Sequence, residues 1–585
     1  MYLKQQFNKK TGRTYLSMAY TYREKGKSYP STKIVESFGY IDELQKTHED
    51  PVAYFGDIVA KRNKAAEDGT AEYIIKANKN DEIPKNTTNR MNYGYIAIIK
   101  IFHDLGLDRF LSNKRRSTKI ECDTSAVMKL LVISRILSPG SKLKAFEERG
   151  RYFEFDKDIL NFELADIYRC LPHFAKLSSD MQLFMHENIT KTYGRRIELV
   201  YYDVTNYYFE VDEEDDFRMK GYSKEHRPDP IVQMGLATDG DGLPISYEVF
   251  PGNESEKLHL RPMVLELHRK YTAGRVIAVA DSAQNTGNNI YYIDQGKQGY
   301  VFSQSIRGGS ADFKDYVVGV DGYEWFGAEY KRKSRVTRRE ISVDFVRGDK
   351  TVKKKILVDQ RQIVFFSEKY AVRAKAKREA ALKKAYKIIG NPAAFTRATS
   401  YGALKYVKNV EFDEKTGEVK ESSAKPCFNH EQLAEDEKYD GYYAIVTNLF
   451  DEGRDTGKFG DDKIIDIYRG LWRVEDSFRV TKNELEARPV YLSREDRIRG
   501  HFLICFVALV IIRLLQKETG YRHSTAKLID AMNDISCSNE YDNLYFFNYR
   551  SDLSDDMGQA LGVDFSKARL TRGDIKRNFA AVKKS

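Results

Sequence analysis

The spacing of apolar residues changes along the chain, and the changes predict regions of different structure. Residues 1–60 alternate between apolar and polar in short runs, with a turn at Gly26-Lys27, which predicts strands followed by a charged helix and a polar linker. Between about Asn92 and Thr192 the apolar residues recur at helical spacing, as they do from Ala126 to Ile133. The first third of the chain is therefore expected to be a strand-rich arm followed by a helical domain.

The next region has a more specific order of elements. Alternation, turn residues and an apolar run predict strands at 197–209, 231–238 and 244–250, a helix near 256–270, and a strand at 276–280. The second and third strands are joined by a tight Asp-Gly turn, which predicts a hairpin. The fourth is apolar throughout, which is typical of a parallel strand. Three antiparallel strands, a helix and a parallel strand form the opening of an RNase H-like fold.

Asp203 stands inside the first of these strands, which otherwise is predicted to be buried on both faces. An unpaired buried charge costs several kcal/mol, so such a carboxylate is normally paired, neutralised or bound to a metal ion. A second carboxylate, Asp281, directly follows the fourth strand. Two aspartates at these places make the strand ends a candidate site.

A third carboxylate is expected on a late helix, predicted from about Lys463 to Leu485. On it Tyr468, Glu475 and Lys482 are seven residues apart and almost eclipsed, and Arg479 lies one turn from Glu475. Taken alone, Glu475 and Arg479 would be an exposed ion pair worth a few tenths of a kcal/mol. Because Asp203 and Asp281 occur at the matching places of the predicted sheet, we favour the interpretation that this face of the helix is functional.

The sequence resembles the DDE transposases of bacterial insertion sequences, particularly those with a late-helix signature of Tyr, Arg, Glu and Lys. Three positions match its spacing: Tyr468, Glu475 and Lys482. Leu471 occupies the Arg position, with Arg469 and Arg473 nearby. Further resemblance lies in the motifs at 201–206, 223–229, 242–253, 279–282 and 471–479. The resemblance covers roughly residues 195–515.

This resemblance implies a catalytic, metal-binding triad of Asp203, Asp281 and Glu475. Carboxylates are hard oxygen ligands that suit Mg²⁺, with Mn²⁺ as a substitute, and two ions about 4 Å apart serve in-line phosphoryl transfer. Asp203 would bridge both ions. Lys482 and Tyr468 would hold a backbone phosphate, and the DNA contacts on this helix would include Arg473 and Arg479.

Roughly 190 residues separate Asp281 from Glu475, far more than one strand and its connections require. The resemblance implies a mainly β insertion here, ahead of a predicted strand at 442–448. Its basic residues Lys331, Arg332 and Arg335 are interleaved with aromatics, which suits a nucleic-acid groove. Trp325 could stack on an unpaired base, but core packing is the favoured role.

Composition is consistent with a DNA-binding protein of several domains. The 585 residues exceed what one core supports, so two to four domains are expected. Lys and Arg outnumber Asp and Glu by 96 to 86, a mild lean toward a polyanionic partner. The five scattered cysteines fit reduced thiols. The apolar run at 502–515 is shorter than the roughly 20 residues of a membrane span and contains Arg513, so a buried helix of a cytoplasmic, nucleoid-associated bacterial protein is expected.

The predicted fold class is α/β: an RNase H-like mixed-sheet core with a large mainly-β insertion, an N-terminal β/helical region and a C-terminal helical region. The expected domains are an arm and linker (1–90), a helical DNA-binding domain (91–194), the core (195–300 and 441–515), the basic insertion (301–440) and a C-terminal helical region (516–585). For 91–194, plain helical packing is an equal alternative, because the sequence lacks a helix-turn-helix signature.

The predicted function is that of a transposase that cleaves the ends of its insertion sequence and joins them to target DNA. Its partner would be double-stranded DNA, bound by a homodimer, with no membrane involved. Two alternatives are a structure-selective nuclease on the same fold, without strand transfer, and a DNA-binding derivative without catalysis.

Overall fold

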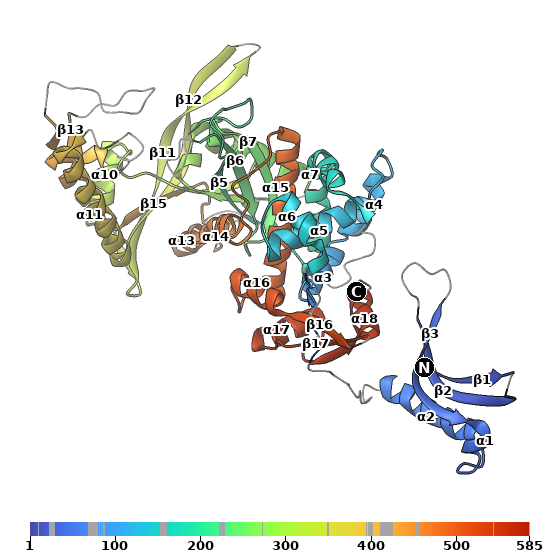
Figure 1. Ribbon diagram of the computed structural model, residues 1–585. Coiled ribbons are helices and arrows are strands. Elements are labelled where there is room, and N and C mark those ends of the chain that lie inside the picture. The colour runs from blue at the N-terminus through green and yellow to red at the C-terminus, as the bar shows by residue number, and fades with distance from the viewer. Residues whose placement is uncertain are drawn as a thin grey trace. The chain divides into compact units, whose positions relative to one another are not determined.

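The computed structural model of the protein (Figure 1) is divided into two compact units, Met1–Thr87 and Thr88–Ser585. The residues that it describes are 1–9, 11–22, 30–67, 80, 82, 85, 88–152, 161–221, 229–271, 273–347, 350–392, 395, 402–409, 425–451, 457–541 and 543–583.

The first unit is a small antiparallel sheet with helices. Its elements are β1 (Tyr2–Asn8), β2 (Arg13–Tyr22), β3 (Ser31–Tyr40), α1 (Ile41–Leu44) and α2 (Pro51–Glu67). The central strand, β2, pairs with both neighbours and carries the buried Leu16 and Met18. This agrees with the predicted N-terminal β/helical region.

The second unit contains a sheet of nine strands in the order β10-β11-β12-β15-β9-β8-β5-β6-β7. They are β5 (Leu199–Tyr208), β6 (Ile231–Thr238), β7 (Pro244–Pro251), β8 (Ile277–Ala280), β9 (Gly299–Ser303), β10 (Glu324–Phe326), β11 (Tyr330–Arg347), β12 (Lys350–Phe366) and β15 (Tyr442–Thr447). Only the pairs β5–β8 and β8–β9 are parallel among these neighbours.

The strand beside β8 is β9, which was not predicted from the sequence. The predicted strand at 442–448 exists as β15, and it lies one position further out and antiparallel to β9. The segment Gly299–Ser303 escaped notice because a short apolar run without alternation cannot be assigned to a strand by periodicity.

Side chains of the core strands alternate between two apolar layers. On β5, Val200, Tyr202 and Val204 belong to the layer that also contains residues of α8 (Leu260–Arg269) and α9 (Gly287–Gln295). Tyr201 and Tyr207 belong to the opposite layer, which contains α13 (Asp461–Arg469), α14 (Trp472–Arg479) and α15 (Glu495–Glu518). The sheet is thus covered by helices on both faces.

The helix predicted from 463 to 485 is interrupted, which corrects the expectation of one regular helix. Between α13 and α14, the bonds from Leu471 N to Tyr468 O (3.0 Å) and from Arg473 N to Gly470 O (3.1 Å) span three residues instead of four. After α14, Val480–Glu484 form a π-helix. The chain path stays nearly continuous, but Tyr468, Glu475 and Lys482 are no longer eclipsed on one regular helix.

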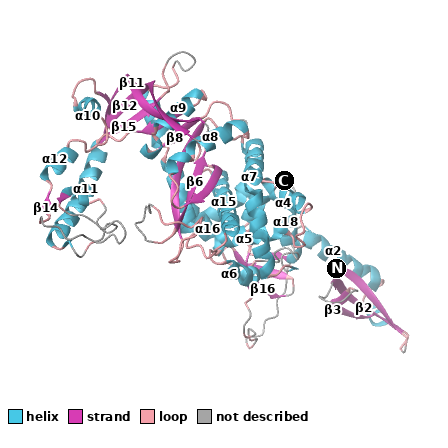
Figure 2. Ribbon diagram, turned by 90° about the horizontal axis from the view of Figure 1, so that it is seen from above, coloured by secondary structure: helices cyan, strands magenta, loops and turns pink. Residues whose placement is uncertain are grey.

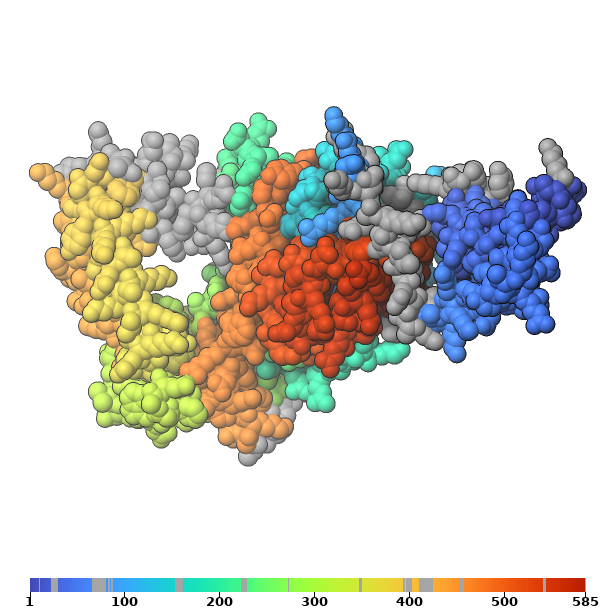
Figure 3. Space-filling view, turned by 60° about the horizontal axis from the view of Figure 1, so that its bottom comes forward, coloured from blue at the N-terminus to red at the C-terminus, as the bar shows by residue number. Residues whose placement is uncertain are grey.

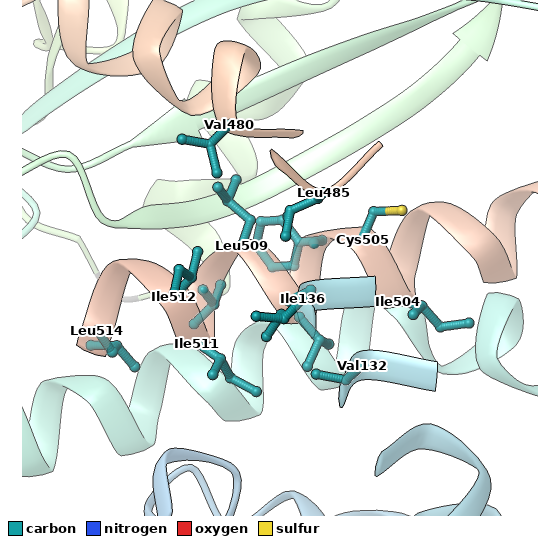
Figure 4. Close-up of a cluster of buried hydrophobic side chains, with 14 of the residues drawn as sticks. Val132, Ile136, Val480, Leu485, Ile504, Cys505, Leu509, Ile511, Ile512 and Leu514 are labelled. Atoms are coloured by element: carbon teal, nitrogen blue, oxygen red, sulfur yellow. The ribbon is translucent and has the colours of Figure 1, made fainter. Parts of the chain in front are cut away.

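The helical region precedes the sheet in sequence and packs around α15. It consists of α3 (Ile96–Asp104), α4 (Leu107–Arg115), α5 (Thr124–Leu137), α6 (Lys142–Glu147) and α7 (Leu164–Tyr193). In Figure 4, Val132 and Ile136 of α5 lie beside α15, and Val480 and Leu485 approach the same core. Among the described residues, α15 is the helix long and apolar enough to cross a membrane, but 94% of its apolar window is buried, as expected of a core helix.

The insertion is less β-rich than expected, and its long strands are part of the core sheet. The hairpin β11–β12 joins that sheet because β12 pairs with β15. The remaining elements are α10 (Ala311–Val318), α11 (Glu368–Gly390), β13 (Val407–Lys408), β14 (Cys427–Phe428) and α12 (His430–Glu437). Figure 2 shows α11, α12 and β14 close together, around a small core of their own.

The C-terminal region is mixed α/β, which corrects the prediction of a helical region. Its elements are α16 (Thr525–Asp534), β16 (Ser536–Tyr541), β17 (Leu544–Phe547), α17 (Asp552–Leu561), β18 (Arg569–Thr571) and α18 (Arg572–Val582). The strands form a sheet in the order β18-β17-β16-β4, where β4 is Arg90–Asn92. The strands have three to six residues, too few for an alternating pattern to stand out, and the partner of β16 on its other side, β4, is more than 400 residues away in the sequence. In Figure 3 these residues form a continuous red surface.

Candidate active site

Asp203 and Asp281 lie on neighbouring parallel strands at matching heights. The pairing of β5 with β8 aligns Leu199 with Ile277 and Tyr201 with Val279. The same offset of 78 residues places Asp203 opposite Asp281, two residues beyond the last paired residues. Adjacent strands are about 4.8 Å apart, so Asp203, in the middle of β5, and Asp281, directly after β8, are neighbours.

Both aspartates occupy the same face of the sheet. Asp203 alternates with Tyr201, which belongs to the layer of α13, α14 and α15, and Asp281 alternates with Val279 of that layer. Asp203 is half-buried, and its Oδ1 accepts a hydrogen bond from Val204 N at 2.8 Å. The carboxylate that looked anomalous in a buried strand therefore stands where the strand reaches the helix that carries Glu475.

Gly470 allows this helix to approach the strand closely. A Cβ atom at Gly470 would overlap the Tyr201 hydroxyl and lie 2.5 Å from Tyr201 Cζ, although the backbone there is right-handed helical. Tyr201 itself is only 2% exposed and has little room to move. Glycine at 470 thus sets the distance between α14 and β5, a role that the sequence did not reveal.

Tyr468 connects the aspartates with the glutamate. Burial raises the pKa of Tyr468, a hydrogen bond with Ser303 opposes that shift, and the charges of Asp281 and Glu475 raise it further. Since both carboxylates act on this hydroxyl, all three groups lie in one neighbourhood. The raised pKa keeps the Tyr468 hydroxyl protonated and able to donate a hydrogen bond.

Glu475 is exposed on α14, and the carboxylates are not drawn together into a cage. Within the described residues, no group of three His, Cys, Asp or Glu side chains is arranged to hold a metal ion. Arg479 contacts Asp476 at 2.8 Å and Glu484 at 2.6 Å. The carboxylates share a face, and side-chain rotation would be needed to bring them around an ion.

Two further cations of the predicted DNA-contacting face lie over aromatic rings. Lys482, in the π-helix, has its Nζ 5.7 Å from the ring centre of Tyr207 on β5. Arg473 lies 5.7 Å from the ring centre of Tyr201 and 5.3 Å from that of Trp472. Both cations are thus held on the same side of the sheet as the carboxylates.

The basic residues of the insertion contact the rest of the protein to different degrees. Arg332 donates from Nε and Nη2 to Asp462 at 2.6 and 2.8 Å and thereby lowers the pKa of Asp462. Arg335 contacts Asp312 at 2.7 Å, while Lys331 lies over the ring of Tyr323 at 4.8 Å. Arg332 therefore ties β11 to the start of α13. This helix begins with Asp461 and Asp462, and these two adjacent carboxylates are the feature of the sequence from which such a contact could have been predicted.

Trp325 is exposed, which corrects the preference for core packing. It lies on β10, a three-residue edge strand, and 59% of it is accessible to solvent. An edge strand without a covering helix leaves its side chains in water. Of the motif at 223–229, residues 223–228 lie outside the described residues.

Comparison with known proteins adds three findings. The family model described as "Transposase DDE domain" matches residues 203–511, more than half of the chain. A Synechocystis sp. protein described as a transposase for insertion sequence element IS4SA is 28% identical over 107 residues, which is 18% of this chain and 29% of that relative. The match thus spans less than a third of the relative. The match to the piggyBac transposase in its synaptic complex with hairpin DNA covers 86% of this chain and 87% of that chain, at 9% identity and a TM-score of 0.35.

Proposed function

The chain belongs to the transposase DDE domain family, and from this premise we propose that it cleaves the ends of its own insertion sequence and joins them to target DNA. The observation that carries the proposal is the placement of Asp203 and Asp281 in register, on the face covered by the helix that bears Glu475. The family match begins at Asp203 itself.

The core of this enzyme is proposed to be RNase H-like. In support, five neighbouring strands of the sheet lie in the order β7-β6-β5-β8-β9. Numbered along the chain from β5, this order is 3-2-1-4-5. The pairs β5–β6 and β6–β7 are antiparallel, whereas β5–β8 and β8–β9 are parallel. This arrangement brings the middle of the first strand, which carries Asp203, beside the end of the fourth strand, which Asp281 follows.

Asp203, Asp281 and Glu475 are proposed to hold two Mg²⁺ ions, with Mn²⁺ as a substitute. The donor chemistry fits, because these ions prefer carboxylate oxygens, and Asp203 would be the ligand shared by both ions. Bound ions would supply positive charge to the attacking and leaving oxygens of an in-line displacement. Glu475 is exposed on the helix that covers this face, and its carboxylate would complete the metal site.

The surrounding residues are proposed to position the DNA backbone. Tyr468 stays protonated and would donate a hydrogen bond to a phosphate oxygen, while Lys482 would supply a point charge. Arg473 and Arg479 remain predicted DNA contacts on the same helix. In the insertion, Lys331, Arg335 and the exposed Trp325 would line the groove, whereas the main contribution of Arg332 is its contact with Asp462. A homodimer would bridge the two element ends.

The test compares wild type with Asp203→Asn in an assay with labelled element ends, a plasmid target and Mg²⁺. We expect joined products from the wild type and none from the variant, because the amide removes a charge required at the metal site. The matched control is Asp466→Asn, an exposed carboxylate on α13 in a loose pair with Arg469 at 3.7 Å, which should keep full activity. Circular dichroism would verify that all three proteins fold.

The outcomes separate the alternatives. Metal-dependent cuts without joining would assign the protein as a nuclease. DNA binding without any cleavage would identify a non-catalytic derivative. Equal activity of the wild type and Asp203→Asn would refute the assignment of the catalytic residues.

A further inference from the structure

A strongly basic cavity has none of the three candidate carboxylates on its lining. It has a volume of about 190 Å³ and is formed by the ends of α5 and α6, by α7, by α15 and by the segment 486–492. The basic residues on its lining are Arg135, Lys142, Arg488 and His501. The single carboxylate on the lining is the exposed Glu486, and Tyr491, 73% exposed, lies at the rim.

Lys142 and His501 form the floor of this cavity. Lys142 is 7% exposed, and its Nζ lies 2.6 Å from His501 Nδ1. His501 Nε2 is 3.1 Å from the carbonyl oxygen of Ala487, so it carries the proton and leaves Nδ1 as the acceptor. Burial keeps this imidazole neutral by lowering its pKa. Lys142 has three N–H donors when protonated, and one of them bonds to His501, so the other two point away from this imidazole.

Arg135 forms a second buried cation beside it. Its Nη1 donates to the carbonyl oxygens of Leu485 and Glu486 at 3.2 and 3.0 Å, and its Nη2 donates to Gly140 O at 3.0 Å. Its Nε is buried and has no hydrogen-bond partner among the described residues. In the part of the chain that the structure describes, the hydrogen-bond partners of Arg135 and Lys142 are carbonyl oxygens and a neutral imidazole, whereas buried cations are normally paired with a carboxylate.

We propose that this cavity binds a phosphate group, which supplies the counter-charge that the protein itself lacks there. A phosphate oxygen would accept a hydrogen bond from Lys142 Nζ, beside the buried guanidinium of Arg135. The cavity exceeds the roughly 30 Å³ of a water molecule several-fold, which leaves room for a phosphate with part of its ester. The proposal stands independently of catalysis at Asp203.

Binding of the phosphate would also affect the backbone conformation of a segment near the candidate active site. Arg135 holds the carbonyls of Leu485 and Glu486, which directly follow the π-helix that carries Lys482. An anion bound beside Arg135 and Arg488 would therefore order the segment that follows the Glu475 helix. The phosphate can come from inorganic phosphate or from the DNA backbone, and the experiment distinguishes these sources.

The test is isothermal titration of the full-length protein with inorganic phosphate at constant ionic strength, comparing wild type, Lys142→Met and Lys191→Met. Methionine keeps the length of the side chain and removes the charge. Lys191 is an exposed lysine on α7 and serves as the control. We expect saturable binding by the wild type and by the control, and at least tenfold weaker binding by Lys142→Met.

A pH series adds a readout that a purely structural role would not change. Burial and the nearby Arg135 lower the pKa of Lys142 to about 7. Sulfate, which keeps its charge from pH 6 to 8.5, should therefore bind more weakly as Lys142 loses its proton. The groups that face Lys142 are Arg135, Tyr168, Glu486, Arg488, His501 and Cys505. Lys142→Met should lack this dependence.

A second arm uses a 20-base-pair DNA duplex in place of phosphate. Weaker duplex binding by Lys142→Met, but not by Lys191→Met, would identify the DNA backbone as the source. Loss of phosphate binding alone would identify free phosphate. If Lys142→Met does not fold, Arg488→Gln at the entrance is measured instead, with the same expected weakening. No saturable phosphate binding by the wild type, or equal binding by the variants, would overturn the proposal.

Discussion

Replacing Gly470 by alanine should separate the helix of Glu475 from the strand of Asp203. The added Cβ would overlap the hydroxyl of Tyr201 and lie 2.5 Å from its Cζ, and Tyr201 is buried. Overpacking of this kind costs about 1–3 kcal/mol. Alanine gains about 1 kcal/mol over glycine within a helix, and the backbone at 470 suits it. The net loss of stability is therefore expected to be at most about 2 kcal/mol.

Activity should fall more than stability, because a shift of α14 moves Glu475 relative to Asp203. The assay is DNA joining at a temperature where the variant remains folded, together with the urea midpoint followed by circular dichroism. Gly390→Ala is the matched control, since Gly390 ends α11 and a Cβ there would contact nothing within 4 Å. The control should be as stable as the wild type or slightly more stable.

The double variant Gly470→Ala/Tyr201→Leu tests the cause. Leucine lacks both atoms that the new Cβ would overlap, so the double variant should lose less stability than the sum of the single losses, by about 0.5–3 kcal/mol. Strict additivity, or a Gly470→Ala protein as active as Gly390→Ala, would refute the steric argument.

Two further predictions concern a buried carboxylate and an exposed ring. Burial of Asp108 opposes its ionisation, but the hydrogen bond from His103 and the charge of Lys129 outweigh it and lower the pKa of Asp108. The ionised carboxylate therefore contributes fully to stability above the pKa of the unfolded state, about 3.9, and this contribution is lost as pH falls through the lower pKa of the folded state. The difference in urea midpoint between wild type and Asp108→Asn should therefore shrink on acidification. A difference that stays constant with pH would contradict this prediction. In a Trp472→Phe background Trp325 is the remaining tryptophan, and single-stranded DNA should quench its fluorescence. Trp325→Ala should weaken binding of single-stranded DNA by about 1–3 kcal/mol but change the free energy of unfolding by less than about 0.5 kcal/mol, because the ring is exposed. Unchanged fluorescence would exclude stacking on a base.

Local patterns in the sequence identified much of the core. The strand around Asp203, the hairpin at Asp239–Gly242 and the apolar strand before Asp281 all form as predicted. Short apolar runs bounded by turn residues are typical of strands buried on both faces, and the turn residues mark the hairpin directly. The family match confirms the resemblance that these motifs carry.

Contacts between distant segments could not be read in this way. The place of β9 beside β8, the pairing of β16 with β4 and the exposure of Trp325 depend on which segments meet after folding. The break at Gly470 is of the same kind, because the atom that requires glycine belongs to Tyr201, more than 250 residues earlier.

The sequence by itself determined the family, the strands of the core and the identity of the three candidate carboxylates, because these depend on residue type and short-range spacing. Only the tertiary structure decided that Asp203 and Asp281 are in register on one face, that Gly470 sets the approach of the Glu475 helix, and that Arg135 and Lys142 meet in a cavity without a counter-charge. Register, close approach and burial arise from long-range packing, for which a one-dimensional pattern holds no signal.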